Sequence, residues 1–335
     1  MPKNIFITGL AGFLGSNLAK SLIQDGHNVK GNDNLEAGSR NNVPEKAVFH
    51  ETDCKDLEGM SEIMEDVDIV YHCAALAHDG FSVFAPNRIN RNIYQATTSV
   101  LTASAKADVE RFVLCSSMAR YGENNPPFNE EMDPAPQTPY AVSKVASEKL
   151  TKVMAESHDF EYNIAVPHNI IGVGQKYNDP FRNVAAIFIN RMIQGKQPII
   201  YGDGQQKRCF SDVDDCVRPM KKLGLMSDIN GEIVNIGPDI EFIDINHLAE
   251  IIADILNFDL DPIYLDERPR EVKNAYCSAE KSRVLLDYNT EKSLRQSLEE
   301  MVEWIIQQGP KEFEYYIEPE IENENLPETW EERIM

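Results

Sequence analysis

Short apolar runs alternate with longer segments in which apolar residues recur every three or four positions. The runs over residues 4–8, 48–51 and 111–115 predict β-strands, and the periodic segments 16–25 and 90–106 predict α-helices. The same alternation predicts further strands over 27–32, 67–73 and 162–166, and a helix over 140–156. Strands that alternate with helices at this spacing predict a parallel, doubly wound α/β sheet of the Rossmann type.

From about Gln175 this alternation becomes irregular. Helical periodicity continues over 183–194, 213–225, 246–256 and 293–307, with short predicted strands at 198–201 and 232–235. We therefore expect a smaller C-terminal α/β lobe that is interleaved with late elements of the sheet. The predicted division is a sheet domain over 1–174, with elements near 213–256 returning to it, a lobe mainly over 175–311, and an acidic, solvated tail or loosely docked arm over 312–335.

The first predicted strand is followed directly by the sequence Gly9-Leu10-Ala11-Gly12-Phe13-Leu14-Gly15, and a predicted helix comes next. Glycines allow a tight turn and a close approach of the backbone, so that a pyrophosphate can rest on the N-terminus of the helix. The spacing is G-x-x-G-x-x-G rather than the commoner G-x-G-x-x-G. Its place between a strand and a helix favours a dinucleotide site.

An aspartate ends the second predicted strand, at Asp33. An acid in this position commonly accepts hydrogen bonds from the adenosine ribose and repels a 2′-phosphate, which favours NAD over NADP. The alternative is an ordinary turn aspartate. Asp53 and Cys54 follow the third predicted strand and can reach the adenine edge, and the small residues Ala74 and Ala75 follow the fourth.

A tyrosine and a lysine lie four residues apart at the start of the helix predicted after a Pro-rich loop, as Tyr140 and Lys144. Residues at this spacing share one face of a helix. A cation close to the phenol favours the phenolate, and a phenolate can remove a proton from a sugar or alcohol hydroxyl. The pattern alone is common on surface helices, but the glycine loop and Ser116-Ser117 after a predicted strand strengthen the catalytic interpretation.

The composition excludes several partners. The net charge of −23 argues against binding to nucleic acid or to an anionic membrane, although local arginines can still hold a phosphorylated ligand. The six cysteines show neither C-x-x-C pairs nor zinc-type histidine spacing, so we expect free thiols in a reducing cytoplasm and no metal. No apolar run approaches the length of a membrane span, and no signal peptide is recognisable.

Taken together, these motifs resemble the extended short-chain dehydrogenases/reductases, in particular the nucleotide-sugar epimerases and dehydratases such as UDP-glucose 4-epimerase. The resemblance covers roughly residues 3 to 305. It implies that Tyr140 is the base, that Lys144 holds the nicotinamide ribose and lowers the pKa of Tyr140, and that Ser117 shares the substrate proton. The implied contacts to NAD are Gly9, Gly12, Phe13, Leu14, Gly15, Asp33, Asn34, Asp53, Cys54, Ala74, Ala75, Asn92, Tyr140, Lys144 and Pro167. The implied contacts to the nucleotide-diphosphate sugar are Asn169, Asn183, Arg208, Arg268 and Ala275.

The resemblance also reduces the number of reactions that the protein is expected to catalyse. Dehydratases of this group carry an Asp-Glu pair after the catalytic serine or threonine, whereas Met118 and Ala119 stand here. The related decarboxylases and 3,5-epimerases carry a Glu or a Cys at the position of Ala119. The remaining Ser117, Tyr140 and Lys144 suffice for a 4-epimerase that works through a 4-keto sugar. The alternatives are a 4,6-dehydratase or 4-oxidoreductase that uses an unusual acid such as His168, and a non-catalytic dinucleotide sensor.

Two further expectations come from the resemblance. The position that limits the size of the C2 substituent falls at Ala275, where a small side chain admits an N-acetyl group; a shift of one residue places Tyr276 there instead. Members of this group often form homodimers through the helices at 90–106 and 140–156, and the apolar spacing of Ala141, Val145 and Leu150 permits this.

Overall fold

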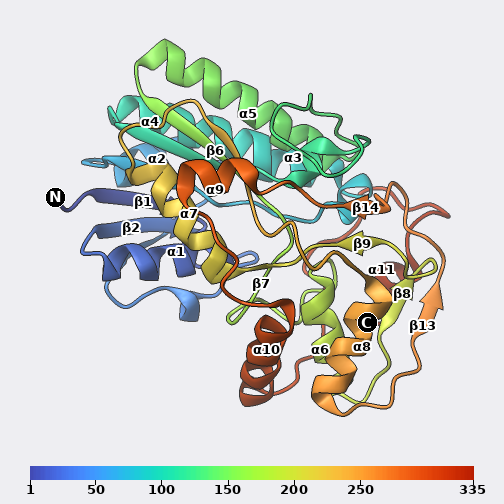
Figure 1. The fold of residues 1–335 in the computed structure, drawn as a ribbon. Coiled ribbons are helices and arrows are strands. Elements are labelled where there is room, and N and C mark those ends of the chain that lie inside the picture. Colours follow the sequence, from blue (N-terminus) through green and yellow to red (C-terminus); the bar gives the residue numbers. More distant parts are fainter.

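A seven-stranded parallel sheet forms the centre of the computed structural model, which describes residues 1–335 (Figure 1). The strand order is β3-β2-β1-β4-β5-β6-β11, and every neighbouring pair is parallel. The order reverses direction at β1, so this is a doubly wound Rossmann-type sheet and the predicted fold class is confirmed. The strands are β1 (Asn4–Thr8), β2 (Asn28–Asp33), β3 (Val48–Glu51), β4 (Ile69–His72), β5 (Arg111–Cys115), β6 (Glu161–Pro167) and β11 (Ile233–Ile236).

Helices cover both faces of this sheet, and the side chains of each strand alternate between the two faces. In β1, Ile5 and Ile7 belong to one apolar cluster while Phe6 belongs to the other. The first face carries α1 (Phe13–Gln24), α7 (Val213–Leu225) and α9 (Glu280–Leu286). The second carries α2 (Leu57–Ile63), α4 (Ala96–Lys106) and α5 (Pro139–His158), and α3 (Pro86–Asn90) leads into α4 through the short helix η3 (Arg91–Gln95).

A second, smaller lobe packs beyond the carboxyl ends of the strands. Its core is an apolar cluster shared by α6 (Val184–Ile193), α8 (Ile245–Leu256) and α10 (Leu294–Gln308). Elements near 213–256 are predicted to return to the sheet; α7 and β11 do so, whereas α8 packs in this lobe. The small strands here are β7 (Ile170–Ile171), β8 (Ile199–Tyr201), β9 (Lys207–Arg208), β10 (Ser211–Asp212), β12 (Ile243–Asp244), β13 (Ile263–Leu265) and β14 (Asn274–Ala275).

The C-terminal segment (residues 309–335) is packed against the rest of the protein. Ile317, Leu326 and Trp330 are buried in an apolar cluster with Phe81 and Tyr140. The segment ends with the short helix α11 (Glu328–Glu331). Of the two expected alternatives, the solvated tail is therefore wrong and the segment is docked, because apolar side chains placed between the glutamates give it a buried side.

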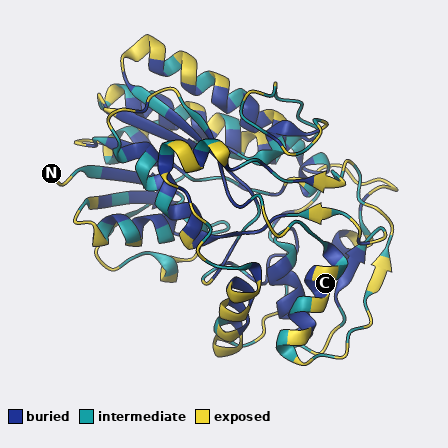
Figure 2. Ribbon diagram, in the orientation of Figure 1, coloured by how far each residue is buried: buried dark blue, intermediate teal, exposed yellow.

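The acidic side chains of this segment also make specific contacts. Glu320 accepts hydrogen bonds from the backbone N–H groups of Asn87 and Arg88, at 2.8 and 2.9 Å. These groups belong to the first turn of α3, where a carboxylate is favourable. Figure 2 shows the central strands almost fully buried and exposed residues along the outer side of α5. None of the helices is both long and apolar enough to cross a bilayer.

Candidate active site

A cavity of about 500 Å³ lies between the sheet and the smaller lobe, at the carboxyl ends of β1, β2, β4, β5 and β6. Every site residue predicted from the sequence lines it, from Gly9 in the glycine loop to Ala275 in β14. Ligands of doubly wound sheets bind at this edge, close to the strand where the order reverses. One cavity is therefore lined both by the residues predicted to bind the dinucleotide and by those predicted to bind the substrate.

The glycine loop leaves the N-terminus of α1 open. The N-cap residue is Gly12, which has no side chain to accept hydrogen bonds from the first amides of the helix. A Cβ on Gly15 would lie 2.2 Å from the carbonyl oxygen of Gly9, and one on Gly9 would lie 2.9 Å from the Cα of Ala74. These glycines are therefore required for the close packing of loop, helix and β4, and the free amides can bind a pyrophosphate.

Asp33 stands at the end of β2 on the floor of the same cavity. Its carboxylate accepts hydrogen bonds from the backbone N–H groups of Leu35 at 2.8 Å and Ala11 at 3.2 Å. Burial raises the pKa of this carboxyl, and the backbone donors act in the opposite direction. The group is thereby fixed beside the glycine loop, where it can accept hydrogen bonds from a ribose.

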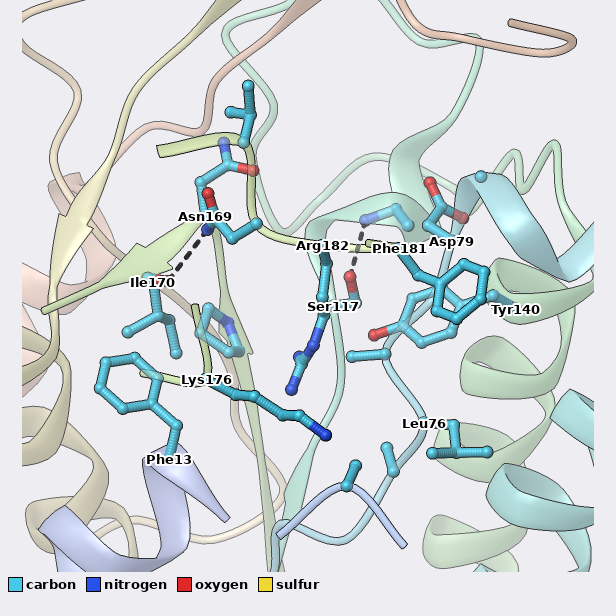
Figure 3. A pocket seen from close by; sticks show the side chains of 18 of the residues that line it. Phe13, Leu76, Asp79, Ser117, Tyr140, Asn169, Ile170, Lys176, Phe181 and Arg182 are labelled. Carbon is cyan, nitrogen blue, oxygen red and sulfur yellow. Dashed lines mark hydrogen bonds between the residues drawn. The ribbon is translucent and has the colours of Figure 1, made fainter. Parts of the chain in front are cut away.

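Ser117 and Tyr140 lie close together in the cavity (Figure 3), and Lys144 also lines it. Thr138 caps α5 by accepting from the N–H of Ala141, and Pro139 occupies the first turn, so the helix begins immediately before Tyr140. Lys144 donates from Nζ to the carbonyl oxygen of Cys115 at 2.7 Å, and its ammonium lies 5.9 Å from the centre of the Tyr140 ring. Ser117, Tyr140 and Lys144 therefore lie close together at the carboxyl end of β5.

The sequence matches the model of the NAD-dependent epimerase/dehydratase family over residues 5–237. The chain belongs to this family. NAD is therefore its cofactor, as predicted, and the chain is an enzyme.

Individual relatives agree with this assignment over nearly their whole length. A Methanocaldococcus jannaschii protein, named provisionally as a UDP-glucose 4-epimerase, is 34% identical over 307 residues, which is 90% of this chain and 98% of the relative. A solved UDP-N-acetylglucosamine 4-epimerase of Methanobrevibacter ruminantium, in complex with UDP-N-acetylmuramic acid, is 33% identical with a TM-score of 0.85, over 92% of this chain and 99% of its own. UDP-glucuronic acid 4-epimerase of Bacillus cereus, solved with UDP-glucuronic acid and NAD, is 27% identical with a TM-score of 0.85, over 91% and 100%.

In this epimerase-family protein, burial and the neighbouring side chains act in opposite directions on the pKa of Tyr140. Burial raises the pKa of Tyr140 above its ordinary value, while the Ser117 hydroxyl and the Arg182 guanidinium act in the opposite direction. Lys144, whose own pKa is lowered by burial, is hydrogen bonded to the backbone instead. The lowering of the Tyr140 pKa by Lys144, which the resemblance implies, stays a prediction for the enzyme with NAD bound.

The two arginines predicted to bind the diphosphate share one carboxylate. Arg268 donates to Glu271 from Nε at 3.2 Å and from Nη2 at 2.9 Å, and Arg208 lies 3.6 Å from the same residue. Arg208 also donates to the carbonyl oxygens of Val272 and Lys273. Glu271 thus orders both guanidinium groups at the cavity wall, where forked donors suit a phosphate.

The two asparagines on the substrate side are held by the backbone. Asn169 donates to the carbonyl oxygen of Cys209 at 2.8 Å, and Asn183 caps α6 by accepting from the N–H of Ala185. Ala275 lines the cavity and Tyr276 does not. Instead, the Tyr276 ring packs against Phe242.

His168 does not line the cavity, although it follows β6 directly. It is buried, and its Nε2 lies 3.0 Å from the carbonyl oxygen of Pro238. Burial lowers its pKa to about 4, so the ring is neutral at pH 7. Its position indicates a packed histidine rather than an acid that contacts a substrate.

Several cavity residues carry no recognisable motif and were missed in the sequence. They include Asp79, Lys176, Arg182 and Glu271. Only the position of Arg182 next to Asn183, a predicted substrate contact, could have drawn attention to it. Their place in the cavity depends on how the smaller lobe meets the sheet.

A buried ion pair supports the catalytic wall from behind. Arg120 lies 3.1 Å from Glu148 of α5, and Ser116 also donates to this carboxylate. Replacing Glu148 by Ala should lower the free energy of unfolding by about 3–5 kcal/mol, because the Arg120 charge stays buried without a partner. Urea denaturation measures this loss.

Two comparison variants make this stability prediction specific. The exposed pair of Lys152 and Glu156 on the same helix is 3.8 Å apart, and Glu156→Ala should change stability by less than about 1 kcal/mol. Combining Arg120→Met with Glu148→Leu should recover much of the loss. A cost below about 1 kcal/mol for Glu148→Ala would contradict the interpretation.

Proposed function

We propose that the protein is a 4-epimerase of UDP-hexoses. One observation supports this most: Ser117, Tyr140 and Lys144 line the same cavity as Met118 and Ala119, whose side chains cannot carry a proton. Dehydration needs extra acid and base groups at those two positions. The similar proteins named above are described as 4-epimerases of UDP-glucose, UDP-N-acetylglucosamine and UDP-glucuronic acid.

In the proposed reaction, Tyr140 removes the proton of the sugar 4-hydroxyl and Ser117 shares that proton. Lys144, anchored on Cys115, fixes the nicotinamide ribose beside them. NAD bound in this cavity would supply the acceptor and donor of the C4 hydride, and its positive charge would favour the phenolate form of Tyr140. The glycine loop and Asp33 hold the dinucleotide, while Asn169, Arg208 and Arg268 hold the substrate diphosphate so that the sugar can turn between them.

The alternative of a 4,6-dehydratase or 4-oxidoreductase receives less support. It requires an additional acid, and the candidate His168 faces the carbonyl of Pro238 outside the cavity. A non-catalytic sensor would have no need of the complete set of Ser117, Tyr140 and Lys144.

Incubation of the NAD-loaded protein with a panel of nucleotide sugars, followed by mass spectrometry and NMR, tests the proposal. We expect C4 epimers of unchanged mass. Because Ala275 is small and faces the cavity, UDP-N-acetylglucosamine should be accepted as well as UDP-glucose. A product lighter by one water would favour the dehydratase, and rejection of the acetamido sugar would contradict the role given to Ala275.

We further propose a cytoplasmic homodimer. Of the residues expected at the dimer face, Ala141 and Val145 are buried within the protomer itself. The outer side of α5 instead exposes Val142 and Val153, which a second copy of the η3–α4 and α5 helices would cover in a four-helix bundle. The six free cysteines suit a reducing compartment. Analytical ultracentrifugation that finds only monomers would rule out the dimer.

A further inference from the structure

Arg182 is a cation beside the reacting groups that no motif or comparison assigns. Its side chain is half-buried, makes no hydrogen bond within the protein, and points into the cavity near Ser117 and Tyr140 (Figure 3). Its charge acts on both Tyr140 and Lys144. The five N–H donors of this guanidinium therefore face the region where the sugar must lie.

The carboxylate closest to Arg182 does not neutralise it fully. Asp179 lies 4.0 Å from the Arg182 Nε, which is beyond hydrogen-bond distance. Its oxygens already accept from the N–H of Phe181 at 2.9 Å and from the hydroxyl of Tyr316 at 2.8 Å. Asp179 thus orients Arg182 without occupying its donors.

The other charges on this side of the cavity are engaged. Lys144 donates to the backbone, and Lys176 pairs with Glu314 at 2.9 Å. Asp79 accepts from Thr138. The forked donors of Arg182 therefore remain available to a ligand, and an uncharged sugar offers them no charged acceptor.

From this arrangement we infer that Arg182 selects nucleotide sugars whose sugar carries a carboxylate. The inference rests on the proposed 4-epimerase function and extends its substrate class to acidic sugars. Two sources of the carboxylate fit this chemistry: C6 of a uronic acid, and a carboxylate-bearing ether on the ring, as in muramic acid. The reaction at C4 is the same for all of them.

The experiment compares kcat/KM of the NAD-loaded wild type, Arg182→Gln and Arg182→Lys on three substrates: UDP-glucose, UDP-glucuronate and UDP-N-acetylmuramate. The wild type should prefer at least one of the two acidic sugars over UDP-glucose. Arg182→Gln should lower that preference by about 10- to 100-fold, because charge-assisted hydrogen bonds are lost. Arg182→Lys keeps the positive charge but not the forked donors of the guanidinium, so it should retain part of the preference for the acidic sugar. The acidic sugar that responds identifies the position of the carboxylate.

Arg295→Gln is the control, because Arg295 is a half-exposed arginine on α10 outside the cavity, paired with Asp254 and Glu299. It should leave the preference unchanged. Inhibition by UDP separates the two ends of the substrate: the inhibition constant should be similar in Arg182→Gln and wild type. If UDP inhibition weakens as much as turnover, Arg182 binds the diphosphate and the inference is overturned.

The inference also fails if the wild type does not prefer an acidic sugar, or if Arg182→Gln leaves the preference intact. In either case, continued epimerisation of UDP-glucose would still support the proposed function, so the two failures are distinguishable.

The C-terminal segment contributes a positioning residue to this group. Tyr316 lies between Asp179 and the buried His78, whose Nε2 is 2.8 Å from the tyrosine hydroxyl. Tyr316→Phe should raise KM for the acidic sugar while changing its kcat less, since only the orientation of Asp179 and Arg182 is disturbed. An equal rise in KM for UDP-glucose would show that Tyr316 has only a general structural role.

Discussion

Replacing Tyr140 by Phe should lower kcat by about 100- to 10,000-fold, the usual contribution of a positioned acid-base group. The ring is buried in the apolar cluster of the C-terminal segment, so phenylalanine keeps the packing and removes only the hydroxyl. Binding of NAD and UDP should therefore stay close to wild type. Steady-state kinetics and calorimetric titration measure the two effects separately.

A matched control is Tyr71→Phe. This tyrosine is also buried, and its hydroxyl donates to the carbonyl oxygen of Lys221 at 2.9 Å, away from the cavity. The Tyr71→Phe variant should therefore keep its epimerase activity. If Tyr140→Phe keeps full activity as well, Tyr140 is not the base; if the wild type itself turns over no nucleotide sugar but binds NAD, the sensor becomes the better interpretation.

The second large effect concerns Trp330 in the C-terminal segment. Its ring packs against Phe81 and Phe181 at centroid distances of 5.3 and 6.0 Å, and its Nε1 donates to the carbonyl oxygen of Pro180 at 3.1 Å. Trp330→Ala should lower the free energy of unfolding by about 3–5 kcal/mol, because it leaves a cavity in this cluster. Since Trp330 and Phe181 both line the active site, kcat/KM should also fall.

Trp330→Phe separates packing from hydrogen bonding. It keeps most of the apolar contact and loses the indole donor, so its cost should be about 1 kcal/mol. Urea denaturation of both variants measures these costs. A loss below about 1 kcal/mol for Trp330→Ala would show that the C-terminal segment is only loosely attached.

The central sheet could be predicted because its inner strands β1, β4 and β5 are short apolar runs that are buried on both faces. The predicted strands at 4–8, 48–51 and 111–115 agree with β1, β3 and β5 to the residue. Strands such as β9 and β14 have two residues each. They form only because the smaller lobe brings their segments together, so no local sequence pattern predicts them.

The site could be predicted where one element positions the chemistry. The glycine loop and the Tyr140–Lys144 spacing each depend on a single turn or helix. The contact of Tyr316 with Asp179 joins residues that are 137 positions apart in the chain. Arg182 reaches the cavity only because the smaller lobe meets the sheet there, so no local pattern predicts its place. The acidic composition of residues 312–335 also hid the buried Ile317 and Trp330, since a count of charges does not reveal which side chains face inward.

The central claim is that Tyr140 and Ser117 act at the sugar C4 hydroxyl and that the hydrogen removed from C4 is returned to the same atom. The most direct measurement uses UDP-glucose and UDP-glucuronate deuterated at C4, incubated with the NAD-loaded protein and analysed by NMR and mass spectrometry. We expect C4 epimers that keep the deuterium at C4 and have an unchanged mass. Loss of the label to solvent, or a product lighter by one water, would contradict it.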